Sequence, residues 1–165
     1  MHKRTFVFIA IVVMLIATFF VAGKLKRNTS PSINLSLFEL KDLNGNEIIV
    51  SQFIKKPLVI NFWGTWCGPC LQEFAAFERV QKKYSTQINF LMISDEPADK
   101  IKKFQQKNNY SFLFVRSLKS FDDLGIASVP VTSLYDANGN FVITKNEPLH
   151  KDELNQLIEA MIGSK

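Results

Sequence analysis

The feature that most restricts the fold of this 165-residue chain is a pair of cysteines, Cys67 and Cys70, separated by two residues. They are the only two cysteines in the chain, and they closely follow the apolar run Leu58–Phe62, which is typical of a strand buried on both faces. Pro69 lies between them, and proline suits the first turn of a helix because its missing N–H needs no partner there. The pattern predicts a strand-to-helix junction with both sulfur atoms at the start of the helix.

Cysteines in such a position are suited to thiol–disulfide exchange. The reaction needs an attacking thiolate, a second thiol that resolves the mixed disulfide, and access for the substrate. The unpaired amides and the dipole at a helix N-terminus favour a thiolate at Cys67. Cys70 follows three residues later and should lie deeper. We therefore predict Cys67 as the nucleophile, Cys70 as the resolving thiol, and a redox-active disulfide between them.

Three other uses of a Cys-x-x-Cys pair fit this chain less well. A structural zinc site needs four ligands, and the other candidate ligand in the domain is the distant His150. Covalent haem attachment needs a histidine directly after the second cysteine, where Leu71 stands. A purely structural disulfide gains little from so short a loop. We therefore expect redox chemistry with neither a metal nor a cofactor.

The first 27 residues form a separate segment. The run from Phe6 to Ala22 is apolar except for Thr18, and basic residues flank it on both sides. With Thr5 and Gly23 it reaches about 28 Å as a helix, close to the ~30 Å of a hydrocarbon core. We expect an uncleaved signal-anchor, that is, one transmembrane helix. The alternative is a cleaved signal peptide, for which this run offers only a weak cleavage site.

The net charge of +5 belongs to this N-terminal segment. Residues 1–30 hold five of the 20 basic residues and no acidic residue, so residues 31–165 hold 15 of each sign. A neutral domain gives no electrostatic basis for binding nucleic acid. The balance of basic residues on the two sides of the apolar run does not determine its orientation in a membrane.

Residues 28–32 are typical of a polar linker, and residues 33–165 of one domain that is large enough for its own core. Asn-Gly pairs predict hairpins within 38–50 and 131–144. Apolar runs predict strands at 58–62 and 88–93, and helical spacing predicts helices at 69–84, 98–107, 117–124 and 151–162. This order indicates an α/β sandwich with a mixed central sheet.

Three side chains are candidates for the surroundings of the cysteines. Glu73 lies one helical turn after Cys70, where it is either a solvated surface glutamate or a buried acid with a raised pKa, suited to proton transfer. Asn61 is polar within the apolar strand, so it either forms hydrogen bonds near the cysteines or marks a strand end. Trp66, next to Cys67 at a turn, should be partly exposed as a docking surface.

Residues 62–70, Phe-Trp-Gly-Thr-Trp-Cys-Gly-Pro-Cys, resemble the active site of the thioredoxin superfamily. The similarity extends from Ile33 to Ile162. Residues 38–45, the charged segment after 93–94 and residues 129–132 resemble the TlpA/ResA-like, membrane-anchored branch, and Glu73 falls on a glutamate that this branch keeps. The resemblance implies a thioredoxin-like sandwich with an added N-terminal β-hairpin and an inserted helix.

The resemblance also implies roles for Val129 and Pro130. Pro130 would be a cis proline facing the cysteines, although X-Pro bonds in general are cis in only about 5–6% of cases. The backbone of Val129 would pair with a bound substrate strand. Asn61 stands at the position where thioredoxin itself has a buried aspartate, and this difference from thioredoxin also fits the TlpA/ResA-like branch.

Proteins of this branch are thiol:disulfide oxidoreductases of the cytoplasmic membrane, with the catalytic domain on the extracytoplasmic (periplasmic) side. The resemblance implies disulfide-containing protein substrates, such as apocytochrome c during cytochrome c maturation, and a membrane electron donor of the DsbD or CcdA type. Three alternatives stay open: a general disulfide oxidant or isomerase, a peroxiredoxin-like antioxidant protein, and an anchored binding module with an inert disulfide. Two departures from the branch leave the substrate open: Ala75-Ala76 stand where the branch often has a proline soon after the glutamate, and residues 145–149 lack a glycine often seen there.

Overall fold

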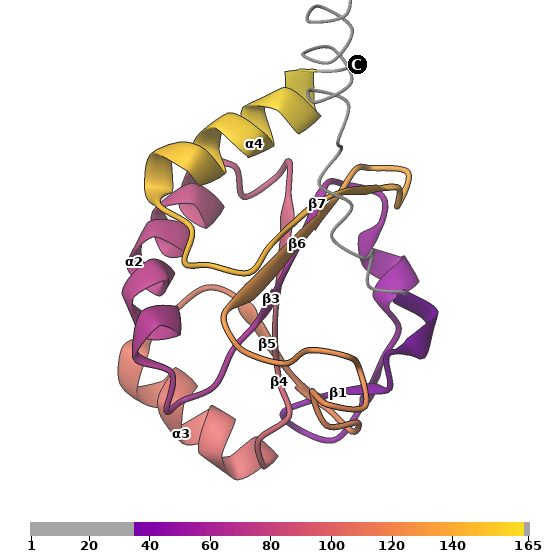
Figure 1. Ribbon diagram of the computed structural model, residues 1–165, viewed down its shortest axis with the longest axis vertical. Coiled ribbons are helices and arrows are strands. Elements are labelled where there is room, and N and C mark those ends of the chain that lie inside the picture. Colours follow the sequence, from indigo (N-terminus) through magenta and orange to yellow (C-terminus); the bar gives the residue numbers. More distant parts are fainter. Residues whose placement is uncertain (1–34, 164–165) are drawn as a thin grey trace, which may run out of the picture. The chain divides into compact units, whose positions relative to one another are not determined.

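The computed structural model describes residues 35–163 (Figure 1). The expected anchor (residues 1–27) and linker (residues 28–32) lie outside the described residues. Within 35–163 no helix is long and apolar enough to cross a membrane.

The described chain contains seven strands, three α-helices and two short 3-10 helices. In chain order they are η1 (Leu35–Leu37), β1 (Leu40–Asp42), β2 (Glu47–Ile48), η2 (Val50–Phe53), β3 (Leu58–Phe62), α2 (Gly68–Lys83), β4 (Asn89–Ser94), α3 (Ala98–Asn108), β5 (Leu113–Ser117), β6 (Val131–Tyr135), β7 (Phe141–Lys145) and α4 (Lys151–Gly163). The strands at 58–62 and 88–93 and the helices at 69–84, 98–107 and 151–162 are thereby confirmed to within a residue or two.

The strands form one mixed sheet in the order β2-β1-β5-β4-β3-β6-β7. Strand β3 pairs in parallel with β4 and antiparallel with β6, so Asn61 lies opposite Thr132. The three α-helices lie on one side of this sheet (Figure 1). The predicted mixed α/β architecture is correct.

Both predicted hairpins form, and the same side chain chemistry closes each turn. Asp42 Oδ1 accepts hydrogen bonds from the backbone N–H groups of Asn44 and Asn46, at 2.8 Å each. Asp136 does the same in the second turn, which joins β6 to β7. Each turn also contains a glycine at positive φ, which explains why an Asn-Gly pair predicts it.

The helix predicted at 117–124 is wrong. Ser117 is the last residue of β5, where it pairs with Leu40, and residues 121–125 form a turn. Gly125 closes this turn with φ of +72°, and Phe121 and Ile126 on its two sides are buried. Pairing of β5 with β1 therefore takes up the start of the expected helix, and too few residues remain for a stable one.

The alternation of strand β3 determines which of its side chains reach the helices. Val59 belongs to a core shared with α2, α3 and α4, while Ile60 and Phe62 belong to a second core on the other face of the sheet. Asn61 is two residues after Val59 and therefore also points toward the helices. This periodicity places a polar side chain under the start of α2.

Candidate active site

Cys67 and Cys70 are joined by a disulfide at the start of α2. Cys67 is the N-cap residue of this helix, and its Sγ accepts a hydrogen bond from the backbone N–H of Cys70 at 3.2 Å. An N–H group aimed at sulfur, together with the helix dipole, stabilises negative charge on Cys67 once the disulfide is reduced. The structure thus provides the setting expected for an attacking thiolate.

The two cysteines differ slightly in solvent exposure. Cys70 is fully buried and Cys67 is 3% exposed, so Cys67 is the more accessible of the two. Trp66, directly before it, is 67% exposed, as expected for a side chain that offers a docking surface.

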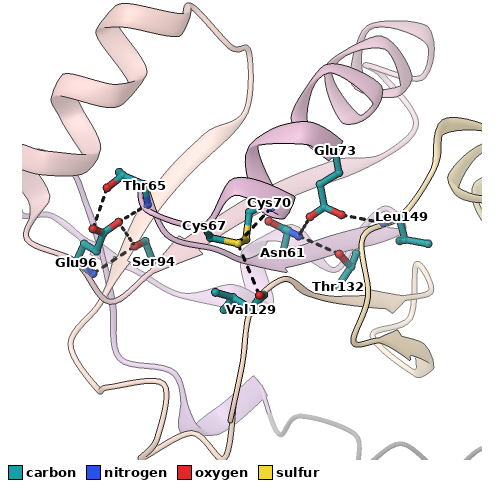
Figure 2. The surroundings of a disulfide bond; sticks show 10 residues. All are labelled: Asn61, Thr65, Cys67, Cys70, Glu73, Ser94, Glu96, Val129, Thr132 and Leu149. Carbon is teal, nitrogen blue, oxygen red and sulfur yellow. Dashed lines mark hydrogen bonds between the residues drawn. A yellow bond between two sulfur atoms is a disulfide. The ribbon is translucent and has the colours of Figure 1, made fainter.

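Pro130 directly precedes β6, and the residue before it contacts Cys67. The Val129–Pro130 peptide is cis, as the resemblance implies. The Val129 carbonyl oxygen lies 3.6 Å from Cys67 Sγ (Figure 2). It is placed to accept the thiol proton of Cys67 in the reduced protein.

Glu73 is buried, so the solvated alternative is wrong for this glutamate. It is 3% exposed, and its two carboxyl oxygens accept hydrogen bonds from Asn61 Nδ2 and from the Leu149 backbone N–H, both at 2.8 Å (Figure 2). Burial raises the pKa of Glu73 from 4.5 to about 7, and the two hydrogen bonds only partly oppose this rise. Glu73 therefore exchanges a proton in the range where a general acid or base works at neutral pH.

Asn61 connects the structural elements around the disulfide. Its amide nitrogen donates to Glu73 on α2 and, at 2.9 Å, to Thr132 Oγ1 on β6. Figure 2 shows the amide oxygen pointing away from both partners, on the side of the cysteine pair. Asn61 is therefore a hydrogen-bonded residue near the cysteines, and the strand-end alternative is wrong.

Glu96 is a site residue that the sequence analysis missed. Its carboxylate accepts hydrogen bonds from the Thr65 backbone N–H at 2.6 Å and from Thr65 Oγ1 at 2.9 Å, and it forms an ion pair with Lys100. Burial opposes ionisation, but the Lys100 ammonium and the Thr65 donors outweigh it and hold the pKa of Glu96 below its ordinary value. Glu96 therefore fixes the loop that leads into the cysteines. The available signal was the spacing of Glu96 and Lys100, which indicates only a charged helix face.

His150 lies just before α4 and is exposed. It lines a hollow of about 280 Å³ together with Glu73, Arg79 and Lys151. Within residues 35–163, no group of three or more histidine, cysteine or acidic side chains could hold a metal ion.

Taken together, these contacts place an exchangeable disulfide beside a buried acid that titrates near neutral pH. Such a site can exchange a disulfide with a substrate and move the accompanying proton.

Comparison with known proteins agrees with this chemistry. Residues 34–147 match the AhpC/TSA family. Thiol-disulfide oxidoreductase ResA of Halalkalibacterium halodurans is 30% identical over 130 residues, which cover 76% of this chain and 72% of that protein. Thioredoxin-like protein YneN of Bacillus subtilis is 28% identical over 127 residues, covering 74% of this chain and 75% of the relative.

A solved structure shows the same fold. The structure of a putative thiol-disulfide oxidoreductase from Bacteroides vulgatus superposes with a TM-score of 0.66 at 29% identity, over 75% of this chain and 91% of that one. The fold, the cysteine pair and the extent of these matches lead to one conclusion: the chain belongs to the AhpC/TSA family and is a thiol-disulfide oxidoreductase with a thioredoxin-like fold.

Proposed function

We propose that this oxidoreductase acts as a reductant of disulfides in extracytoplasmic proteins, among them the haem-binding cysteine pairs of apocytochrome c. The observation that carries the proposal is Glu73, a buried acid with a pKa of about 7 that lies one helical turn after Cys70. A reductant must deprotonate its resolving thiol in every turnover, and a base that titrates near neutral pH meets that need.

The reaction starts from the protein with both thiols reduced. The Cys67 thiolate attacks one sulfur of the substrate disulfide, a mixed disulfide forms, and the other substrate sulfur leaves as a thiolate. Cys70 then loses its proton to Glu73 and attacks Cys67 Sγ, which releases the second substrate sulfur. Two electrons pass from the protein to the substrate, both substrate thiolates take up protons, and the Cys67–Cys70 disulfide of the structure is the product.

Asn61 supports the resolving step by holding Glu73 in place. In Figure 2 it lies between the disulfide and the Glu73 carboxyl group. Its hydrogen bonds to Glu73 and Thr132 orient the carboxyl group, and the Leu149 N–H orients its second oxygen. The proposed proton acceptor is thus held by one strand, the neighbouring strand and the loop before α4.

The proposed location rests on the apolar run within residues 1–27. As a single-pass anchor in the cytoplasmic (inner) membrane, it would hold the domain on the extracytoplasmic side, where disulfides persist in protein substrates. The oxidised product must be reduced again after each turnover. We assign that step to a membrane electron donor of the DsbD or CcdA type.

The test is substrate trapping by the full-length Cys70→Ser variant in the native membrane. Without the resolving thiol, the mixed disulfide at Cys67 should accumulate and carry the substrate through purification. Capture of apocytochrome c would support the proposal, and a captured set without it would contradict that part. The Cys67→Ser/Cys70→Ser variant is the control, because it should trap nothing.

Peroxide reduction is a second candidate because of the AhpC/TSA match. Peroxiredoxins place Pro-x-x-x-Thr/Ser-x-x-Cys around the reactive thiol. Relative to Cys67, this chain has Ile60 in place of the proline and Gly64 in place of the hydroxyl residue. A peroxide-consumption assay with the reduced protein separates the candidates, and turnover that depends on Cys67 would favour the peroxidase.

A further inference from the structure

A hollow of about 210 Å³ lies beside the reactive disulfide, and the residues that matter for its chemistry are Trp66, Asp95, Phe121, Asp122, Ile126 and Val129. Its volume is below the range of 300–1,000 Å³ that is typical of pockets for small molecules and cofactors. It is instead comparable to the volume of one large side chain. The size points to a subsite for a residue of a protein substrate.

Two of the lining residues place the hollow next to the attacking sulfur. Trp66 directly precedes Cys67, and the Val129 carbonyl oxygen lies 3.6 Å from Cys67 Sγ (Figure 2). A substrate whose disulfide reaches Cys67 must therefore pass over Trp66 and Val129. The residue next to the attacked cysteine is then the one that lies over the hollow.

The walls of the hollow combine apolar surface with negative charge. Trp66 offers an exposed indole, and Phe121 and Ile126 are buried beneath the surface. Asp95 is half-buried, and its Oδ2 is held in place by the Phe121 backbone N–H at 3.0 Å. Asp122 is exposed.

No cation of the described residues neutralises these two carboxylates. The lining contains no lysine, arginine or histidine. The neighbouring Lys100 is paired with Glu96, and Lys119 is paired with Glu39. Among the ion pairs within 35–163, none involves Asp95 or Asp122.

We propose that this hollow is a specificity subsite that receives a lysine or arginine side chain adjacent to the attacked cysteine of a protein substrate. The aliphatic part of that side chain would pack on Trp66 and Ile126, and its charged end would lie near Asp95 and Asp122. An acidic side chain in the same place is repelled, and an apolar one fits without a charge partner. The proposal rests on the exchange reaction at Cys67 described above, and it is independent of whether apocytochrome c is the substrate.

The test compares three disulfide-bonded peptides of one sequence, in which lysine, leucine or glutamate flanks the target cysteine on both sides. The reduced full-length protein is mixed with each peptide at low ionic strength, and the second-order rate constant is measured by separating peptide thiols from disulfides. We expect the lysine peptide to react on the order of tenfold faster than the glutamate peptide. The difference should shrink at high salt.

Variants assign this preference to the hollow. Asp95→Asn/Asp122→Asn should reduce the ratio of lysine to glutamate rates to near one, and Asp122→Lys should reverse it. The rate with the leucine peptide should change little. Asp99→Asn is the control: it removes one negative charge at an exposed residue of α3 that does not line the hollow, and it should keep the preference.

The outcomes distinguish a failure of the proposed subsite from a failure of the proposed reductant function. Equal rates for the three peptides, or a preference that the double variant retains, would overturn the subsite and leave the oxidoreductase function intact. Failure to reduce any of the three peptides would contradict the reductant function as well as the subsite.

Discussion

The pH dependence of folding stability should report the buried carboxyl group of Glu73. Its pKa is about 7 in the folded protein because of burial, compared with an ordinary value of 4.5. The folded protein keeps this proton up to about pH 7, whereas the unfolded chain releases it near pH 4.5. The free energy of unfolding therefore falls as the pH rises from 4.5 to 7, and above pH 7 the full destabilisation applies.

The size of this cost follows from the two pKa values. Each tenfold change in proton affinity corresponds to 1.36 kcal/mol, so the shift from 4.5 to about 7 amounts to about 3 kcal/mol. Glu73→Gln removes the titration while keeping the shape of the side chain. The NH2 group of the new glutamine then faces another donor, either the Leu149 N–H or the Asn61 amide. This unsatisfied contact should lower the free energy of unfolding by about 1–3 kcal/mol at every pH.

The assay is urea unfolding of the oxidised protein and of the oxidised Glu73→Gln variant between pH 4 and pH 8. We expect the free energy of unfolding of the native protein, relative to the variant, to fall by about 3 kcal/mol across this range. Taking the difference cancels the other acids, which titrate in both proteins. Glu47→Gln, at an exposed position of β2, should follow the native curve. Parallel curves for the native protein and Glu73→Gln would refute the burial argument.

Three further predictions concern the cysteines, the loop before them and the turns. Cys67→Ser should abolish disulfide exchange, while Cys70→Ser should accumulate a mixed disulfide visible on a non-reducing gel; full turnover by Cys67→Ser would exclude it as the nucleophile. Glu96→Gln should lower the free energy of unfolding by about 1–3 kcal/mol because it weakens the charged hydrogen bonds to the active-site loop, and an unchanged urea midpoint would count against that role. Gly139→Ala should destabilise the protein more than Gly45→Ala in thermal unfolding: both glycines have positive φ, but a Cβ at Gly139 would lie 2.7 Å from a neighbouring side chain, whereas nothing lies within 4 Å at Gly45. Equal melting temperatures would contradict this difference.

The parts of the fold that were predictable from sequence are those determined by neighbouring residues. Each hairpin turn needs only an aspartate, two asparagines and a glycine within five positions, and the hydrogen bonds that the aspartate side chain accepts come from inside that stretch. Helix α2 likewise begins where Pro69 and its N-cap Cys67 require. Such features are visible in a single sequence because no distant partner decides them.

The region from 113 to 126 shows the opposite case. Residues 117–124 have helical spacing, but β5 pairs with β1, which lies more than 70 positions earlier in the chain. That pairing extends through Ser117 and leaves only the turn that Gly125 closes. Tertiary pairing here overrides local helical propensity, and no residue within the segment signals it.

The arrangement around Glu73 was only partly predictable for the same reason. Its helical position relative to Cys70 is local, so proximity to the cysteines could be inferred. Its burial depends on Asn61, 12 positions earlier, and on Leu149, 76 positions later. Leu149 contributes a backbone N–H, which no side chain pattern can reveal. The alternatives for Glu73 therefore could not be separated before the sheet and the loop before α4 were in place.

The neutral amide at Asn61 determines how many protons this buried site can hold. A carboxylate at that position would lie within hydrogen-bonding distance of Glu73, and two buried acids so close cannot both ionise, which spreads their titrations apart. With an amide at position 61, the Glu73 carboxyl group accepts hydrogen bonds from the Asn61 amide and the Leu149 N–H, neither of which is an acid. Its pKa therefore stays at about 7. Because disulfide exchange requires one proton to leave the resolving thiol, a site that takes up one proton near neutral pH matches the stoichiometry of that step. Asn61 thus supports the chemistry by remaining uncharged, and it supports the structure by joining β3 to α2 and β6.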